Sequence, residues 1–144
     1  MKILMTLVAA VALAVLSLHA ADPAATYVDH DKVAEAFAKG GALAQGSDFS
    51  ASVARRAGPG QVEVHEKETD IFYITEGDAT FVTGGTMVGG KLSRPGQWLG
   101  TDIQGGVTHH LTKGDIITIP AGVPHWFKEV KSPILYYMVK VIRP

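Results

Sequence analysis

The sequence of 144 residues contains no cysteine, and this absence narrows the chemistry that the protein can carry out. Without cysteine there are no disulfide bonds to stabilise an exported domain, and there is no thiol to carry a covalently attached lipid. Thiolate ligands are excluded as well. Any metal ion must therefore be held by histidine and carboxylate side chains.

A surplus of charge of either sign is also absent. The 13 Lys and Arg residues nearly balance the 14 Asp and Glu residues, and the formal net charge is −1. The sequence has no basic stripe to suit a phosphate backbone and no amphipathic basic helix to suit a membrane surface. We therefore expect no nucleic-acid partner and no stable membrane association of the mature chain.

A long apolar run occurs at the N-terminus, in residues 3–18, after a short positive start that includes Lys2. Leu18-His19-Ala20 follows as a small-residue cleavage site. This pattern is typical of a secretory signal peptide in residues 1–20, and we expect a periplasmic or secreted mature protein. A membrane helix is the alternative, but the run is short for a bilayer and is followed by Pro23 rather than by basic residues.

Residues 21–48 are expected to form a flexible lead-in and one short amphipathic helix. Asp29 offers an N-cap oxygen, and Gly40 ends the helical pattern. Val33 and Phe37 recur at helical spacing between these two positions. We interpret them as an apolar stripe that packs against a sheet.

From residue 49 onward the apolar pattern changes to a period of two, which is typical of strands. The strands that it predicts lie at residues 49–54, 61–65, 70–75, 79–83, 107–111, 116–119, 125–130 and 134–142. Glycine-rich turns interrupt residues 84–106, which we expect to form an excursion with short edge strands. Trp98 within it either packs on the domain or lines its mouth, and packing is favoured. The pattern indicates an all-β sandwich or small barrel, formed as one domain by residues 49–144.

Histidines and carboxylates occupy predicted strands at positions that can point inward. Strand parity places Glu63 and His65 on one face, and Asp70 begins the next strand. His125 follows a corner at residues 120–124, whose prolines fix the backbone. Because strand ends converge in a small barrel, these side chains can meet inside it. Imidazoles and carboxylates without sulfur suit Fe, Mn, Zn or Ni.

The stretch GDIITIPAGVPHWFKE, residues 114–129, matches the pattern G-x5-P-x-G-x2-H-x3-N almost completely. The fixed positions are occupied by Gly114, Pro120, Gly122 and His125. Glu129 stands where the pattern has Asn. On these residues the chain resembles the cupins, a superfamily of small antiparallel jelly-roll barrels. The resemblance implies a cupin barrel over most of the mature chain.

The other cupin motif, G-x5-H-x-H-x3-4-E-x6-G, is met in part. Asp70 and Gly77 fit its Glu-to-Gly half, with Asp in place of Glu, which puts His65 at the second His and Glu63 at the first. The metal ligands implied by the resemblance are His65, Asp70 and His125, with Glu63 as an altered fourth ligand. An alternative register makes His65 the first His and Lys67 the second, and would leave only two imidazoles. The face shared by Glu63 and His65 favours the first register.

Further side chains near these strands have two interpretations each. Of the adjacent His109 and His110 only one can point into the barrel, and His109 is favoured as an extra ligand or pocket base because it is in phase with Leu111. Phe72 and Phe127 are in phase with the candidate ligands. They form either the apolar wall of a pocket or part of the core.

Two functions follow from the resemblance. One is a metal-dependent enzyme acting on a small organic molecule, of dioxygenase or isomerase type, with Glu63 as a ligand or general base. The other is a non-catalytic extracytoplasmic module that binds a small ligand or metal, which the anionic pair of Glu63 and Asp70 would suit. A β-sandwich that acts only through protein contacts is a third hypothesis, disfavoured by the fit of residues 114–125. Single barrels of this kind resemble family members that pair, so we expect a homodimer.

Overall fold

The computed structural model describes residues 24–144, and the signal peptide expected at residues 1–20 lies outside them. The predicted helix is present as α1, His30–Lys39. Its N-cap is Asp29, whose carboxylate accepts hydrogen bonds from the backbone N–H groups of Asp31 and Lys32, and its C-cap is Gly40. Within residues 24–144, no helix is long and apolar enough to cross a membrane.

Thirteen strands follow the helix along the described chain. They are β1 (Gly41–Gln45), β2 (Phe49–Arg56), β3 (Val62–His65), β4 (Glu68–Glu76), β5 (Asp78–Thr83), β6 (Thr86–Val88), β7 (Lys91–Arg94), β8 (Gln97–Gly100), β9 (Asp102–Gln104), β10 (Val107–Thr112), β11 (Ile116–Ile119), β12 (His125–Glu129) and β13 (Ile134–Ile142). Each strand predicted from the period-two pattern is present, with ends that differ by no more than two residues. β1 was not predicted, because its short sequence GALAQ does not alternate clearly and its strand conformation depends on pairing with β2.

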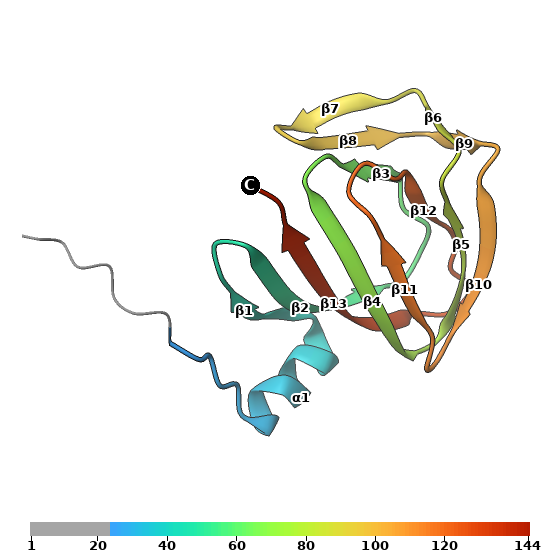
Figure 1. Ribbon diagram of the computed structural model, residues 1–144. Helices are drawn as coiled ribbons and strands as arrows, with labels where there is room; N and C mark the ends of the chain where they lie inside the picture. Colours follow the sequence, from blue (N-terminus) through green and yellow to red (C-terminus); the bar gives the residue numbers. More distant parts are fainter. Residues whose placement is uncertain (1–23) are drawn as a thin grey trace, which may run out of the picture.

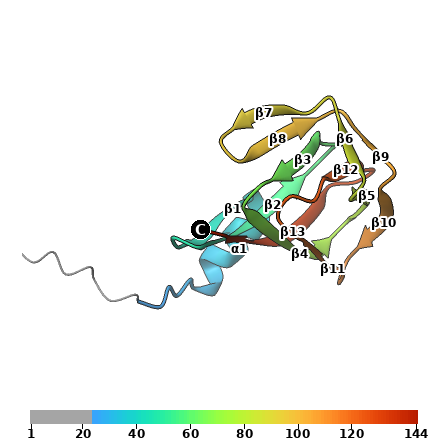
Figure 2. The ribbon, with the colours of Figure 1, turned by 45° about the horizontal axis from the view of Figure 1, so that its top comes forward.

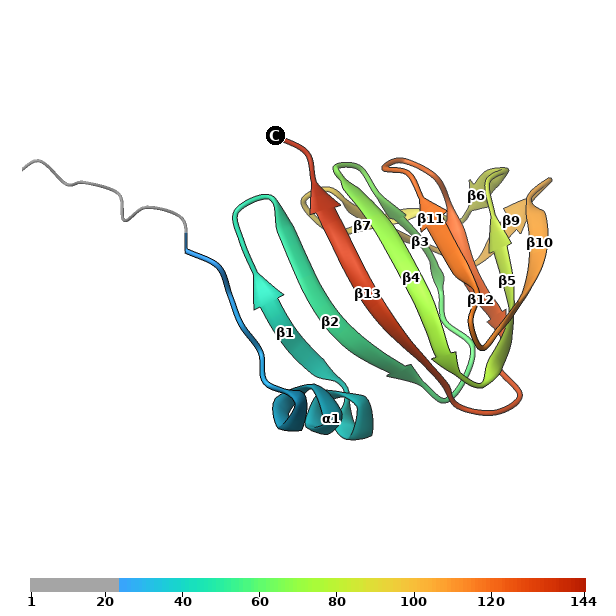
Figure 3. The same ribbon diagram turned by 60° about the horizontal axis from the view of Figure 1, so that its bottom comes forward.

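The strands form two main antiparallel layers. Five strands make one sheet in the order β1-β2-β13-β4-β11, and six make the other in the order β10-β5-β12-β3-β8-β7. Figure 3 shows the five-stranded sheet with its strands side by side and α1 against the ends of β1 and β2. In Figure 1 the hairpin of β7 and β8 lies across one end of the molecule. The predicted all-β jelly-roll with one short helix is confirmed.

The glycine-rich excursion forms the short strands that were expected. β8 extends the six-stranded sheet by pairing with β3, β7 is the edge strand beside it, and β6 and β9 pair with each other. Figure 2 shows the hairpin of β7 and β8 projecting beyond β3. Trp98 lies opposite Val64 and so faces away from Glu63 and His65, and its Nε1 donates to Glu66 Oε1 at 2.7 Å. This position agrees with packing rather than with a wall of the mouth.

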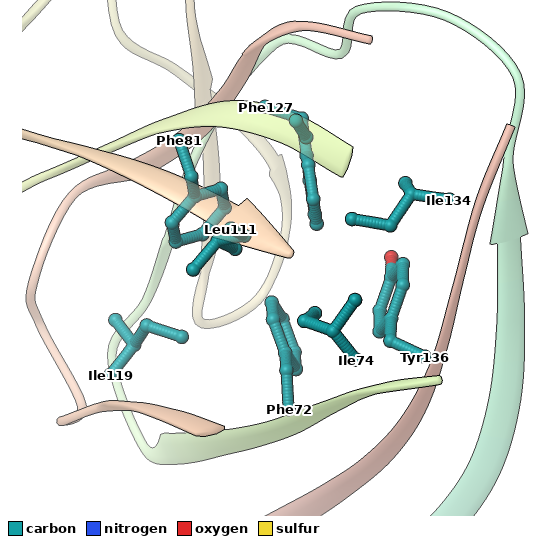
Figure 4. Packing of buried hydrophobic residues seen from close by; sticks show 9 residues of the cluster. Phe72, Ile74, Phe81, Leu111, Ile119, Phe127, Ile134 and Tyr136 are labelled. Carbon is teal, nitrogen blue, oxygen red and sulfur yellow. The ribbon is translucent and has the colours of Figure 1, made fainter. Parts of the chain in front are cut away.

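The core between the two layers is rich in aromatic side chains. Figure 4 shows Phe72 and Tyr136 from the five-stranded sheet facing Phe81 and Phe127 from the other. The ring centroids of Phe72 and Tyr136 are 4.8 Å apart, and those of Phe81 and Phe127 are 4.6 Å apart. Phe72 and Phe127 are buried in this core and also line a pocket above it. Both of their interpretations are therefore correct, because the core forms the floor of that pocket.

The outer face of the five-stranded sheet keeps several large apolar side chains exposed. Tyr73 on β4, Ile116 on β11 and Val141 on β13 are 44%, 67% and 43% exposed. Ile116 and Tyr73 are register partners on this face, and a contiguous apolar patch there would mark a surface that meets another protein. The expected homodimer stays a prediction, which the mass of the protein in solution would decide.

Candidate metal centre

The four predicted metal-site residues lie together at one end of the core. Glu63 and His65 project from β3, and His125 begins β12 directly opposite Glu63. Asp70 lies on β4 in the facing sheet. His65, Asp70 and His125 are 4%, 2% and 5% exposed, so these polar groups are removed from water.

The distances between the side-chain atoms suit a shared cation. His65 Nε2 is 3.4 Å from Glu63 Oε2 and 3.5 Å from Asp70 Oδ2, and His125 Nε2 is 3.7 Å from the same Asp70 oxygen. Metal–ligand bonds of about 2.0–2.2 Å place neighbouring ligand atoms about 3.0–3.5 Å apart. The donor set therefore fits a divalent ion with small adjustments. Binding of a metal by these residues stays a prediction.

The corner before β12 holds His125 in place. Val123 N–H donates to Pro120 O at 3.1 Å, which closes a tight turn in which Gly122 has φ +84°. The Gly122 N–H also donates to His65 O at 2.7 Å. The corner is thereby tied through its backbone to the strand that carries the other candidate imidazole.

Hydrogen bonding also fixes which nitrogen of His125 is available to an ion. Nδ1 lies 3.1 Å from Val123 O and donates to it, so the neutral ring presents the lone pair of Nε2 toward Asp70. Burial lowers the pKa of His125 below its ordinary value of 6.5. The ring is therefore neutral near pH 7, as a metal ligand must be.

Asp70 is paired on its second oxygen with a residue that we did not predict. Lys140 on β13 lies opposite Asp70 in the sheet, and its Nζ donates to Asp70 Oδ1 at 2.7 Å. The same ammonium group is 2.9 Å from Glu68 Oε2. Lys140 leaves Asp70 Oδ2 directed at the two imidazoles and compensates part of the buried negative charge.

Glu68 is an additional candidate ligand. Two groups of three residues have ligand atoms within 4.8 Å of one another and could hold a metal ion: Glu63, His65 and His125 form the first, and His65, Glu68 and Asp70 form the second. Burial raises the pKa of Glu68, but the hydrogen bond from Lys140 and the charges of Lys140, His65 and Arg94 together lower the pKa below its ordinary value of 4.5. Glu68 has the same strand parity as Asp70, so extending the predicted strand by two residues would have found it.

Glu63 connects the cluster to an arginine. Its Oε2 faces His65, and its Oε1 lies 3.8 Å from Nη2 of Arg56 at the end of β2. Interaction with His65 lowers the pKa of Glu63 below 4.5, although burial opposes this shift. The carboxylate is 29% exposed and borders the pocket, so it can serve as a ligand or as a proton acceptor.

A pocket of about 190 Å³ opens above this cluster. It is lined by Arg56, Gln61, Glu63, His65, Asp70, Phe72, Arg94, Gln97, His125, Trp126, Phe127, Tyr136, Met138 and Lys140. Lys140 and Arg56 share strand parity with inward-facing neighbours, Met138 and Ala54. Extending the alternation of inward and outward side chains to the ends of β13 and β2 would have identified Lys140 and Arg56 as inward-facing residues.

His109 does not join the cluster. Its Nε2 is 2.9 Å from Thr83 Oγ1, a contact within the six-stranded sheet. It is not among the residues that line the pocket. The structure therefore does not support His109 as an extra ligand or pocket base.

Comparison with known proteins identifies a family and a fold. The sequence model of the family described as Cupin matches residues 18–141. No curated protein matches the chain significantly in sequence. The cupin domain of Schizosaccharomyces pombe Cnp3 is 15% identical with a TM-score of 0.52, and the match covers 72% of this chain and 60% of that chain.

Two bacterial structures are similar in fold as well. BH2720 from Bacillus halodurans is 15% identical with a TM-score of 0.58, and the match covers 82% of each chain. The DMSP lyase DddQ from Ruegeria pomeroyi DSS-3 is 19% identical with a TM-score of 0.50; the match covers 71% of this chain and 45% of the lyase. At these identities the similarity concerns the fold alone.

The lowered pKa values predict how the stability of the metal-free protein depends on pH. Between pH 6.5 and the lower pKa of folded His125, the unfolded chain binds more protons than the folded one. The free energy of unfolding should therefore fall as the pH drops below 6.5, by at most about 1.4 kcal/mol per pH unit for this group. Below pH 4.5 the free energy of unfolding should fall further, because the stabilisation that comes from the lowered pKa values of Glu63 and Glu68 is lost.

Urea unfolding in the presence of a chelator, measured from pH 8 to pH 4, would test this dependence. His125→Gln should remove the decline that begins near pH 6.5. His110→Gln, which replaces an exposed ring on β10, is the matched control and should retain the decline. A wild-type stability that stays level between pH 7 and pH 5 would contradict the buried, neutral state of His125.

Proposed function

This chain belongs to the cupin family, and on that premise we propose that it is a metal-binding cupin with Glu63, His65, Asp70 and His125 as ligands. One observation carries the proposal. Beneath a pocket, His65 Nε2 lies 3.4 Å from a Glu63 oxygen and 3.5 Å from Asp70 Oδ2, and His125 Nε2 lies 3.7 Å from the same Asp70 oxygen. Glu63, His65 and His125 each offer a ligand atom within 4.8 Å of the other two. Iron, manganese, zinc and nickel all suit this set of nitrogen and oxygen donors.

The first candidate activity is that of a metal-dependent enzyme of dioxygenase or isomerase type. A divalent ion would polarise an oxygen atom of a small organic molecule in the pocket. Glu63 borders the pocket and can accept a proton at its partly exposed carboxylate, while Phe72 and Phe127 exclude water from below. A lyase that shares the fold, from Ruegeria pomeroyi, is consistent with catalysis on this scaffold.

The second candidate is a non-catalytic module that retains a metal ion or a small ligand. Its support is the number of carboxylates, since Glu63, Asp70 and Glu68 all lie near His65. A donor set with this much negative charge favours holding a cation. The pocket above the cluster would then admit the ion or a small ligand rather than a substrate.

We further propose that the protein is exported after cleavage behind Ala20. The apolar run in residues 3–18 supports export, and cleavage there would leave α1 and all the described strands intact. N-terminal sequencing of protein recovered outside the cytoplasm should begin at Ala21. A chain that retains Met1 would contradict the proposal.

Metal analysis of the purified protein tests the ligand assignment. The wild type should retain a stoichiometric divalent ion after dialysis, and the ion should raise its melting temperature. His65→Ala and His125→Ala should each lower the affinity at least about 100-fold, since even residues that only orient a ligand contribute about 10- to 100-fold. His109→Ala is the control and should bind metal like the wild type, because His109 contacts Thr83 instead.

A wild-type protein that is free of metal, and whose melting temperature does not change when Fe(II), Mn(II), Zn(II) or Ni(II) is added, would refute this assignment. Equal losses in the His109 variant and the two ligand variants would also refute it.

Turnover measurements separate the two candidate activities. Oxygen uptake and product formation would be followed on a panel of small enols, diols and keto acids, with metal-loaded protein. An enzyme should show metal-dependent turnover, and Glu63→Gln should reduce kcat by about 10²- to 10⁴-fold if Glu63 is the general base. The binding module should show stoichiometric binding of ligand or metal without turnover.

A further inference from the structure

Arg56 is a cationic residue of the metal pocket that has no carboxylate within hydrogen-bond distance among residues 24–144, although its guanidinium interacts with the Tyr136 hydroxyl. Its Nε–H is buried and has no hydrogen-bond partner in this described part of the chain. The nearest carboxylate oxygen, Glu63 Oε1, is 3.8 Å from Nη2 and therefore beyond hydrogen-bond length. A buried guanidinium donor without a partner is costly, and this is a reason to expect an acceptor beside it.

The structure around Arg56 holds the guanidinium group in place. Its Cζ lies 4.9 Å from the ring centroid of Phe127. On another side is Gly60, where an added Cβ would come within 2.6 Å of Arg56 Nη1. The Gly60 N–H donates to Phe127 O at 3.0 Å, and Gly60 O accepts from Trp126 Nε1 at 2.7 Å. The absence of a side chain at position 60 thus makes room for the guanidinium beside a loop that is fixed to β12.

Cationic residues on the pocket wall can meet an anion beside the carboxylate-rich cluster. Three cationic residues and two carboxylates line it. Lys140 pairs closely with Asp70 and Glu68, whereas Arg94 and Arg56 lie 3.9 Å and 3.8 Å from Glu68 and Glu63, beyond hydrogen-bond length. Arg94 is more than half exposed, and Arg56 is the less exposed of the two. Arg56 remains to bind a ligand, and a divalent ion in the cluster would add further positive charge. The planar fork of a guanidinium matches the two oxygens of a planar carboxylate.

The size of the pocket limits the ligand. Its volume of about 190 Å³ is below the range of about 300–1,000 Å³ that is typical of sites for drug-sized ligands. The ligand is therefore a molecule of a few carbon atoms. The amides of Gln61 and Gln97 on the pocket wall can bind additional oxygen atoms.

Resting on the proposed metal site, we propose that the pocket binds a small carboxylate whose carboxyl group accepts hydrogen bonds from the guanidinium of Arg56. The rest of the molecule lies toward Glu63, His65 and His125. Arg56 then determines specificity for carboxylates over neutral molecules of the same shape.

Isothermal titration of metal-loaded protein tests this proposal, with lactate and malonate as probes and lactamide and malonamide as their neutral counterparts. The wild type should bind the carboxylates at least about 10-fold more tightly than the amides. Arg56→Gln should weaken carboxylate binding about 10- to 100-fold, because a charge-assisted pair of hydrogen bonds is lost. Arg56→Lys, which keeps the charge without the fork, should give an intermediate loss.

Arg55→Gln is the matched control. Arg55 is the preceding residue of β2, is exposed on the opposite face and does not line the metal pocket, so its variant should bind the carboxylates like the wild type. Gly60→Ala is a second test that keeps Arg56 but displaces its guanidinium, and it should weaken carboxylate binding as well. If the Arg56→Gln variant does not fold, Gly60→Ala becomes the deciding variant.

Metal content is measured on the same preparations, so that the two proposals can fail separately. Metal-loaded wild type that binds amides and carboxylates equally, or neither, overturns the carboxylate proposal and leaves the metal site standing. Unchanged carboxylate binding in the deciding Arg56 or Gly60 variant also overturns it. If the protein holds no metal, the metal proposal fails. The same titrations on metal-free protein then test Arg56. Carboxylate binding that is weakened in the deciding variant supports its role, and unchanged binding overturns it.

Discussion

The ion pair between Asp70 and Lys140 is the interaction on which the rest of the candidate site depends. Asp70 is 2% exposed and lies between the two sheets, so its charge must be compensated inside the protein. Lys140 compensates one oxygen at 2.7 Å and leaves the other facing two imidazoles. Removing one partner of such a buried pair generally costs about 3–5 kcal/mol. The pair therefore preserves both the stability of this end of the barrel and the direction of the carboxylate.

Strand pairing explains how these side chains meet without a dedicated loop. Lys140 lies opposite Asp70 in one sheet, and His125 lies opposite Glu63 in the other. The aromatic core below packs the two sheets against each other and forms the floor of the pocket. Because every group of the cluster is attached to paired strands or to a hydrogen-bonded corner, a cation would meet a site that is already organised. The same framework aligns Arg56 at the pocket wall.

Most of the fold and the candidate ligands could be predicted from the sequence, because they depend on local patterns. Strand parity placed Glu63 and His65 on one face, and the proline corner predicted how His125 would be presented. β1 could not be predicted, since it is a strand only through its pairing with β2. Lys140 and Arg56 were missed because each looks like the polar end of a strand, although strand parity places both on the inward face. His109 had the right parity, but its partner Thr83 lies on a neighbouring strand that the sequence does not identify.

X-ray absorption spectroscopy of the metal-loaded protein measures the central claim most directly, because it reports the atoms bound to the ion. The account predicts a first shell of nitrogen and oxygen at about 2.0–2.2 Å, with the outer-shell scattering of two imidazoles. In His125→Ala the scattering of one imidazole should disappear. A shell of oxygen atoms without imidazole, or a spectrum that is the same in His125→Ala, would show that the ion lies elsewhere and would contradict the account.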